Sequence, residues 1–116
     1  MHTAVGRAVL DRLSALPELG VAVLDAVKLY EGGLHHLTNE LWYVRCQPET
    51  AARRLRELRG MSPEHAAARL RAQPPFNAEK QAACTEIIDN DGDIAALERT
   101  VGRLFAEFQR RHAANI

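Results

Sequence analysis

Three long polar side chains near the middle of the chain have the types and the spacing of an anion clamp. Arg69 and Gln73 are four residues apart in a segment of helical composition, so both are expected on one face of a helix, and Arg59 lies on the turn before it. Guanidinium groups pair bidentately with phosphate oxygens, so phosphate binding is the chemistry that this clamp would perform. A solvated basic helix face is the alternative, and this is the usual role of Arg-rich helices on small domains.

The residues just before the clamp predict a sharp helix start that positions it. Gly60 can end the preceding helix, because glycine enters the left-handed conformation without a steric penalty. Ser62 then offers a hydroxyl as N-cap, and Pro63 suits the first helical position. Glu64 places negative charge near the positive end of the helix dipole. A new helix is therefore predicted from Pro63.

A second group of polar residues follows a short apolar run at 21–24. If that run is a strand of a parallel sheet, Lys28 and Glu31 lie beyond its carboxyl end, where ligands gather in open α/β sheets. A simple ion pair between these two residues explains them equally well. The adjacent histidines, His35 and His36, point in different directions and no Cys or carboxylate pattern completes a coordination shell, so no metal site is predicted.

Hydrophobic patterning predicts an α/β fold in which helices flank a parallel sheet of about three strands. Strand and helix alternate along the chain, as in right-handed crossover units. The patterns predict strands at 21–24, 41–46 and 85–88, and helices at 3–16, 48–58, 63–73, 77–83 and from 94 onward. Asn77 and Asp93 are the expected N-caps of the last two helices. Residues 89–93 resemble a calcium loop only superficially, and a capped turn accounts for them better.

Composition limits the classes of function. With 116 residues the chain is expected to form one domain, 1–116, and its 15 basic and 15 acidic residues give no global field that would attract nucleic acid or an anionic membrane. No apolar run approaches the ~20 residues needed to span a bilayer. Cys46 and Cys84 are expected to be buried free thiols rather than a disulfide. A cytoplasmic location is the default expectation.

Several short segments, taken in order, resemble the later part of the dephospho-coenzyme A kinase family. The matching segments are His2 with Val5, Val23-Leu24-Asp25, Leu29-Tyr30-Glu31, Leu41-Trp42-Tyr43-Val44, Arg54-Leu55, Arg59 to Glu64, Ala68 to Gln73, and Ile88-Asp89-Asn90-Asp91-Gly92. Together they cover nearly the whole chain. The most specific part is the run from Arg59 to Gln73 followed by Asn90 and Gly92.

The resemblance implies a P-loop kinase fold with a mobile lid at about 59–76. Members of the family use ATP and Mg²⁺ to phosphorylate the ribose 3′-hydroxyl of dephospho-coenzyme A, the last step of coenzyme A biosynthesis. By resemblance, Arg69 is the catalytic lid arginine that reaches the transferring phosphates, and Arg59 and Gln73 bind the nucleotide with it. Asn90 and Gly92 match the turn near the adenine of ATP, and Glu31 matches the floor of the substrate cleft.

One motif of the family does not occur in these 116 residues. A P-loop requires Gly-x-x-x-x-Gly-Lys-Ser/Thr, whose backbone amides cradle the phosphates and whose hydroxyl holds Mg²⁺. The chain is therefore expected to be a truncated kinase, inactive alone, which self-associates or receives its N-terminal part from a complementary chain. The alternatives are a non-catalytic nucleotide-binding remnant and an interaction or scaffold module. No metal ligand is predicted within the chain.

Overall fold

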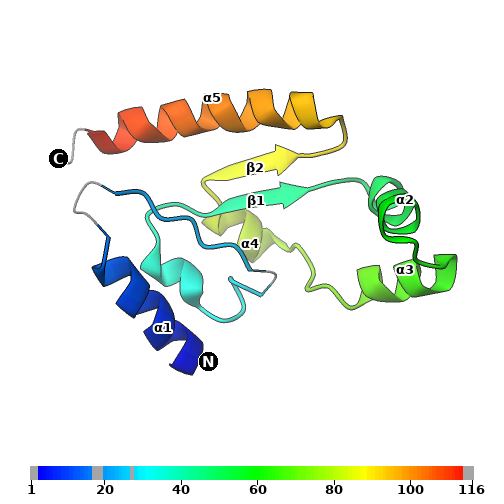
Figure 1. Cartoon of the computed structure of the whole chain (residues 1–116), viewed down its shortest axis with the longest axis horizontal. Coiled ribbons are helices and arrows are strands. Elements are labelled where there is room, and N and C mark those ends of the chain that lie inside the picture. Colours follow the sequence, from blue (N-terminus) through cyan, green and yellow to red (C-terminus); the bar gives the residue numbers. More distant parts are fainter. Residues whose placement is uncertain (1–2, 17–19, 27, 114–116) are drawn as a thin grey trace. The chain divides into compact units, whose positions relative to one another are not determined.

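The computed structural model describes residues 3–16, 20–26 and 28–113, with side chains from Gly6 onward (Figure 1). The chain divides into two compact units, Met1–Leu41 and Trp42–Ile116, and each is described by itself. A single domain over 1–116 stays a prediction. No helix within the described ranges is both long and apolar enough to cross a membrane.

The first unit contains α1 (Thr3–Ser14), a predicted helix that ends two residues earlier than expected, and the 3₁₀ helix η1 (Leu34–Leu37). The predicted strand at 21–24 is wrong, because residues 20–26 have no regular structure. Val21 and Val23 are 49% and 83% exposed, whereas the prediction required a strand buried on both faces. A strand exists only with a neighbour to complete its hydrogen-bond ladder, and the sheet within the described residues has two strands rather than about three.

The second unit is built on a parallel pair of strands, β1 (Trp42–Arg45) and β2 (Glu86–Asp89). The register pairs Trp42 with Glu86 and Arg45 with Asp89, so the carboxyl ends of both strands meet at one edge. Both strands were predicted, and β2 begins one residue later than expected. Ile88 at the centre of β2 is only 2% exposed, so the apolar run that predicted this strand does form part of the core.

Helix α5 (Ile94–Ala113) runs along the pair of strands (Figure 1). Its Phe108 meets Trp42 edge to face with 6.5 Å between ring centroids, and Arg111 lies 3.8 Å from the Glu86 carboxylate. Successive strand side chains point to opposite faces, so Tyr43 faces away from Phe108. Helix α5 therefore packs on the Trp42 face near the start of the strands, whereas Val44, further along the same face, is 54% exposed.

Three helices connect the strands and confirm the predicted capping. Helix α2 (Pro48–Arg59) ends at Gly60, which has φ 64°, and α3 (Pro63–Arg71) begins with the Ser62 hydroxyl accepting from the His65 amide at 3.1 Å. Asn77 caps α4 (Ala78–Ala83) through the Lys80 amide at 2.9 Å. Helix α3 is shorter than predicted, because Pro74 disfavours the helical conformation at Gln73.

Gly60 and Gly102 give a matched prediction about the backbone. Gly60 has a left-handed conformation, so Gly60→Ala is expected to lower the free energy of unfolding by about 1 kcal/mol. Gly102 lies inside α5, where an added Cβ meets no atom within 4 Å, so Gly102→Ala is expected to raise it by about 0.5–1 kcal/mol. Urea denaturation of both variants provides the measurement, and shifts of equal sign would contradict the assigned conformations.

Candidate functional site

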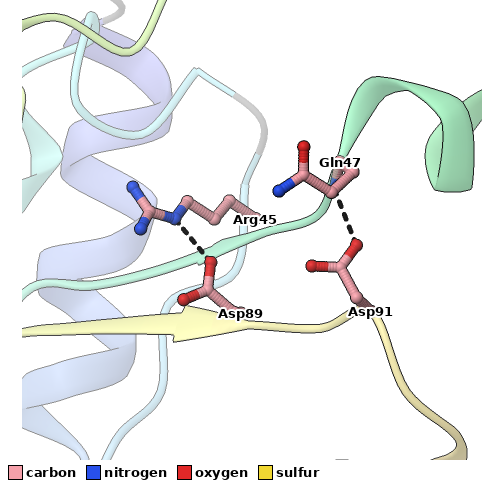
Figure 2. Close-up of polar contacts among 4 residues, drawn as sticks. All are labelled: Arg45, Gln47, Asp89 and Asp91. Carbon is pink, nitrogen blue, oxygen red and sulfur yellow. Dashed lines mark hydrogen bonds and ion pairs between the residues drawn. The ribbon is translucent and has the colours of Figure 1, made fainter.

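The carboxyl edge of the strand pair is fixed by polar contacts between β1 and the turn after β2 (Figure 2). Arg45 Nε donates to Asp89 Oδ1 at 2.7 Å, and this hydrogen bond raises the pKa of Arg45. The Gln47 amide donates to Asp91 Oδ1 at 2.7 Å, and the Asn90 amide donates to the Arg45 carbonyl at 2.7 Å. The turn at 89–92 is thus bonded to β1 and to the residue before α2.

Arg54, near the middle of α2, also bonds to this turn. Its Nη1 donates to the Asn90 carbonyl at 2.6 Å, and its Nη2 donates to the Gly92 carbonyl at 3.0 Å. A planar guanidinium holds its two donors in a fixed relative orientation, whereas the three donors of an ammonium group rotate freely. Arg54 therefore determines where the Asn90 and Gly92 carbonyls point.

Helix α5 starts directly after this turn, and Asp93 forms its predicted N-cap. The Asp93 carboxylate accepts from the Ala96 amide at 2.8 Å, and its carbonyl accepts from the Leu97 amide at 3.2 Å. A Cβ added at Gly92 would lie 3.3 Å from the Ala96 side chain. A larger residue at position 92 would therefore crowd the first turn of α5.

An open cavity of about 610 Å³ lies between α2, the turn and the start of α5. It is lined by Arg54, Leu58, Asn90, Gly92, Asp93, Ile94, Ala95 and Leu97. It is closer to an open surface depression than to an enclosed pocket. Leu58 and Ile94 are 78% and 75% exposed, so large apolar surface is available next to the polar turn. This combination suits a flat ligand with apolar faces and polar edges, such as a heterocyclic base.

The predicted clamp residues lie on other parts of the same unit. Arg59 ends α2 and Arg69 lies in the last turn of α3, two helices that pack against each other. Both arginines are exposed, and neither forms an ion pair with a carboxylate in the described part of the chain. Gln73 is outside α3, so the predicted shared helix face with Arg69 is wrong. None of the three lines the cavity, whereas Asn90 and Gly92 do.

Glu31 lies in the first unit, on an exposed turn, whereas all the residues that line the cavity belong to the second unit. Among the residues that the structure describes, no three His, Cys, Asp or Glu side chains are grouped as they would be around a metal ion. Cys46 and Cys84 are free thiols, as predicted, but both are only half-buried. Burial raises the pKa of Cys84.

His35, close to Glu31, is packed in a short stack of rings. Its ring centroid is 4.4 Å from that of Tyr30 and 4.0 Å from that of His36. The buried Nδ1 atom has no hydrogen-bond partner within the described residues. Burial lowers the pKa of His35, the neighbouring His36 lowers it further, and Glu31 opposes the shift.

Acid is expected to weaken the folding of the first unit through His35. The pKa of His35 in the folded chain is lowered from the usual 6.5, so the unfolded chain binds more protons in acid. The contribution of neutral His35 to the free energy of unfolding is therefore fully present above about pH 6.5, and it is lost as the pH falls through the folded pKa. His35→Phe keeps an aromatic ring in the stack and removes the titration. Thermal unfolding at pH values between about 5 and 8, where histidine changes charge, should therefore show a flatter profile for the variant. Parallel profiles would contradict this role of His35.

Comparison with known proteins places the chain in a family. The dephospho-CoA kinase family model (CoaE) matches residues 1–96. The chain belongs to the dephospho-CoA kinase family. The family resemblance stated from the sequence is thereby confirmed, and the mixed α/β fold with a parallel strand pair is consistent with part of a P-loop kinase.

Curated proteins named dephospho-CoA kinase are similar to most of the chain. The Synechocystis sp. protein is 35% identical over 98 residues, which are 84% of this chain and 48% of the relative. The Gloeobacter violaceus protein is 38% identical over 86 residues, 74% of this chain and 42% of the relative. The Streptomyces avermitilis protein is 36% identical over 112 residues, 96% of this chain and 54% of the relative. The chain spans about half the length of these relatives.

In this member of the dephospho-CoA kinase family, Arg54 belongs to the candidate site, although the sequence did not predict it. It was noted only as part of the Arg54-Leu55 match, because spacing gave it no partner near it in the chain. Its two acceptors, at Asn90 and Gly92, are 36 and 38 residues away. The indication that the sequence did offer for Arg54 was its place in a segment that resembles the family.

Arg54→Ala is expected to release the turn and to lower the free energy of unfolding by about 1–2 kcal/mol. Hydrogen bonds to charged groups contribute about 1.5–3 kcal/mol each, and the partial exposure of this pair of bonds reduces that value. Arg54→Lys should not restore stability, because lysine lacks the forked donors. Arg53→Ala, on the exposed neighbour, is the matched control. Urea denaturation gives the measurement, and equal losses for the two alanine variants would argue against the role of Arg54.

Proposed function

We propose that this chain provides the nucleotide-binding turn and the lid of a dephospho-CoA kinase, which transfers the γ-phosphoryl group of ATP to the 3′-hydroxyl of dephospho-CoA. The observation that carries the proposal is the cavity whose polar rim, at Asn90 and Gly92, is fixed by Arg54. Membership of the family and the apolar surface of Leu58 and Ile94 support the assignment of adenine to this cavity.

In this proposal the adenine lies between the apolar lining and the turn, and the phosphates extend toward the lid at about 59–76. Arg69 stabilises the charge of the transferring phosphoryl group, with Arg59 and Gln73 as further donors. The exposure of Arg59 and Arg69 and their lack of carboxylate partners in the described chain support this role, since an arginine already paired with a carboxylate would not be available to phosphate. Glu31 is proposed to contribute to the acceptor cleft.

The residues of this chain fit the base of ATP but do not fit Mg²⁺. The cavity, with its polar turn and apolar walls, fits the base of ATP. The described residues do not form a metal-binding group, and the P-loop hydroxyl that holds Mg²⁺ in such kinases has no equivalent in these 116 residues.

A non-catalytic nucleotide-binding protein is the second candidate. It is favoured by one observation: the cavity is formed entirely by residues of the second unit and requires no P-loop.

Val44 on β1 is 54% exposed, and apolar surface of this kind on a strand favours self-association or a complementary chain. A cytoplasmic location stays a prediction.

The test is phosphoryl transfer by a chimera in which the N-terminal half of the Streptomyces avermitilis relative precedes this chain. The alignment covers 96% of this chain, so the junction leaves all the proposed site residues in place. Transfer from ATP to dephospho-CoA, measured with a coupled assay, is expected, and a folded chimera without turnover would reject the kinase proposal. Calorimetry of the 116-residue chain with millimolar ATP addresses the second candidate, which fails if no heat is detected.

A further inference from the structure

Phe76, at the downstream end of the 59–76 segment, packs against β1. Its ring stacks on that of Tyr43, with 4.2 Å between centroids and 25° between ring planes. The guanidinium carbon of Arg45 lies 5.9 Å from the centre of the same ring, within the range of a cation–π contact. Tyr43 and Arg45 share one face of the strand, because they are two residues apart.

Arg45 also contacts the turn that forms the polar rim of the cavity. The Nε atom donates to Asp89 Oδ1 at 2.7 Å (Figure 2). The Arg45 carbonyl accepts from the Asn90 amide at 2.7 Å. One residue therefore contacts both Phe76 and the first two residues of the turn. The guanidinium is a rigid plane, so a displacement of Phe76 that tilts this plane also moves its Nε donor at Asp89.

We propose that Arg45 is a positioning residue that couples the end of the 59–76 segment to the nucleotide-binding turn. The inference rests on the proposed function, in which these are the lid and the base-binding site. When the segment moves toward bound phosphates, Phe76 and Arg45 transmit the movement to Asn90 and Gly92. By thermodynamic reciprocity, a base held at the turn favours the arrangement of the segment that fits it.

The chain offers a comparison that separates coupling from ordinary structural support. The side chains of Arg45 and Asp89 are 45% and 61% exposed, and exposed ion pairs contribute little to global stability. Replacing Arg45 should therefore leave the fold intact. Phe105 is the matched aromatic control, because it stacks on Phe108 of its own helix and makes no ring contact with Arg45 among the described residues.

The test is a double-mutant cycle in the 116-residue chain, followed by amide NMR. Phe76→Leu is expected to displace the Asn90 and Gly92 amide resonances when residue 45 is arginine, and to leave them in place in the Arg45→Gln background. Phe76→Tyr, which keeps the ring, should restore the original positions, and Phe105→Leu should not displace them. Displacements of the same size in both backgrounds overturn the proposal.

A second variant and a ligand arm keep the result unambiguous. If Arg45→Gln does not fold, Asp89→Asn takes its place in the cycle, because it removes the charged acceptor at constant size. The coupling is supported if Phe76→Leu no longer displaces the Asn90 and Gly92 amide resonances in this background. An undiminished displacement overturns it. ATP is titrated separately into the unmodified chain. A chain in which the cycle shows coupling but ATP shifts neither amide retains the inference and counts against the proposed base site.

Discussion

A polypeptide limited to these 116 residues is expected to show no dephospho-CoA-dependent consumption of ATP. The phosphate cradle, its lysine and the hydroxyl that holds Mg²⁺ are encoded by a motif that the sequence does not contain. Loss of one preorganised donor alone costs about 10²- to 10³-fold in kcat, and here several are missing together. Turnover should therefore not exceed that of the reaction mixture without protein.

The chimera with the Streptomyces avermitilis N-terminal half is the positive control for this experiment. It adds the N-terminal half of the relative, so the chimera should show turnover in the same coupled assay. Robust, protein-dependent turnover by the 116-residue chain, which disappears when Arg69 is replaced, would show that another group holds the phosphates.

Arg69→Ala in the active chimera is expected to lower kcat by about 10²- to 10³-fold, since an arginine that contacts the transferring phosphoryl group stabilises charge in the transition state. Arg69 is exposed on α3 and has no carboxylate partner in the described residues, so the substitution should leave the fold unchanged. The KM for dephospho-CoA should change much less than kcat, because the contact strengthens only in the transition state.

Arg71→Ala is the matched control for this substitution. Arg71 is also exposed and is also in the last turn of α3, but it lies two residues further along and so projects from a different side of the helix. It should change kcat far less than Arg69→Ala does. Equal effects of the two substitutions would show that α3 contributes only a general positive field.

Local chemistry predicted much of this fold, because it acts between residues close in the chain. Gly60, Ser62, Asn77 and Asp93 all end or begin helices as expected, since the side-chain caps and the left-handed glycine require no distant partner. The strands β1 and β2 were found for a related reason. Each strand has a run of apolar and branched residues that predicts it locally, and the two runs, although far apart in the chain, pair with each other within the same unit.

The features that were missed depend on distant residues. The apolar run at 21–24 predicted a strand, but its pattern carries no information about whether a neighbouring strand is present to pair with it. Gln73 was placed on a helix that Pro74 ends early. Arg54 was missed because its acceptors are carbonyl groups, and any residue at positions 90 and 92 supplies a carbonyl.

The parallel direction of β1 and β2 also affects how the protein reaches its folded state. The Arg45–Asp89 and Gln47–Asp91 bonds each join residues 44 positions apart, with three helices in between. Such long loops must lose their conformational freedom before either contact contributes, whereas the intervening helices form locally. We therefore expect the cavity beside this turn to assemble late during folding, and to be among the first regions lost on partial unfolding.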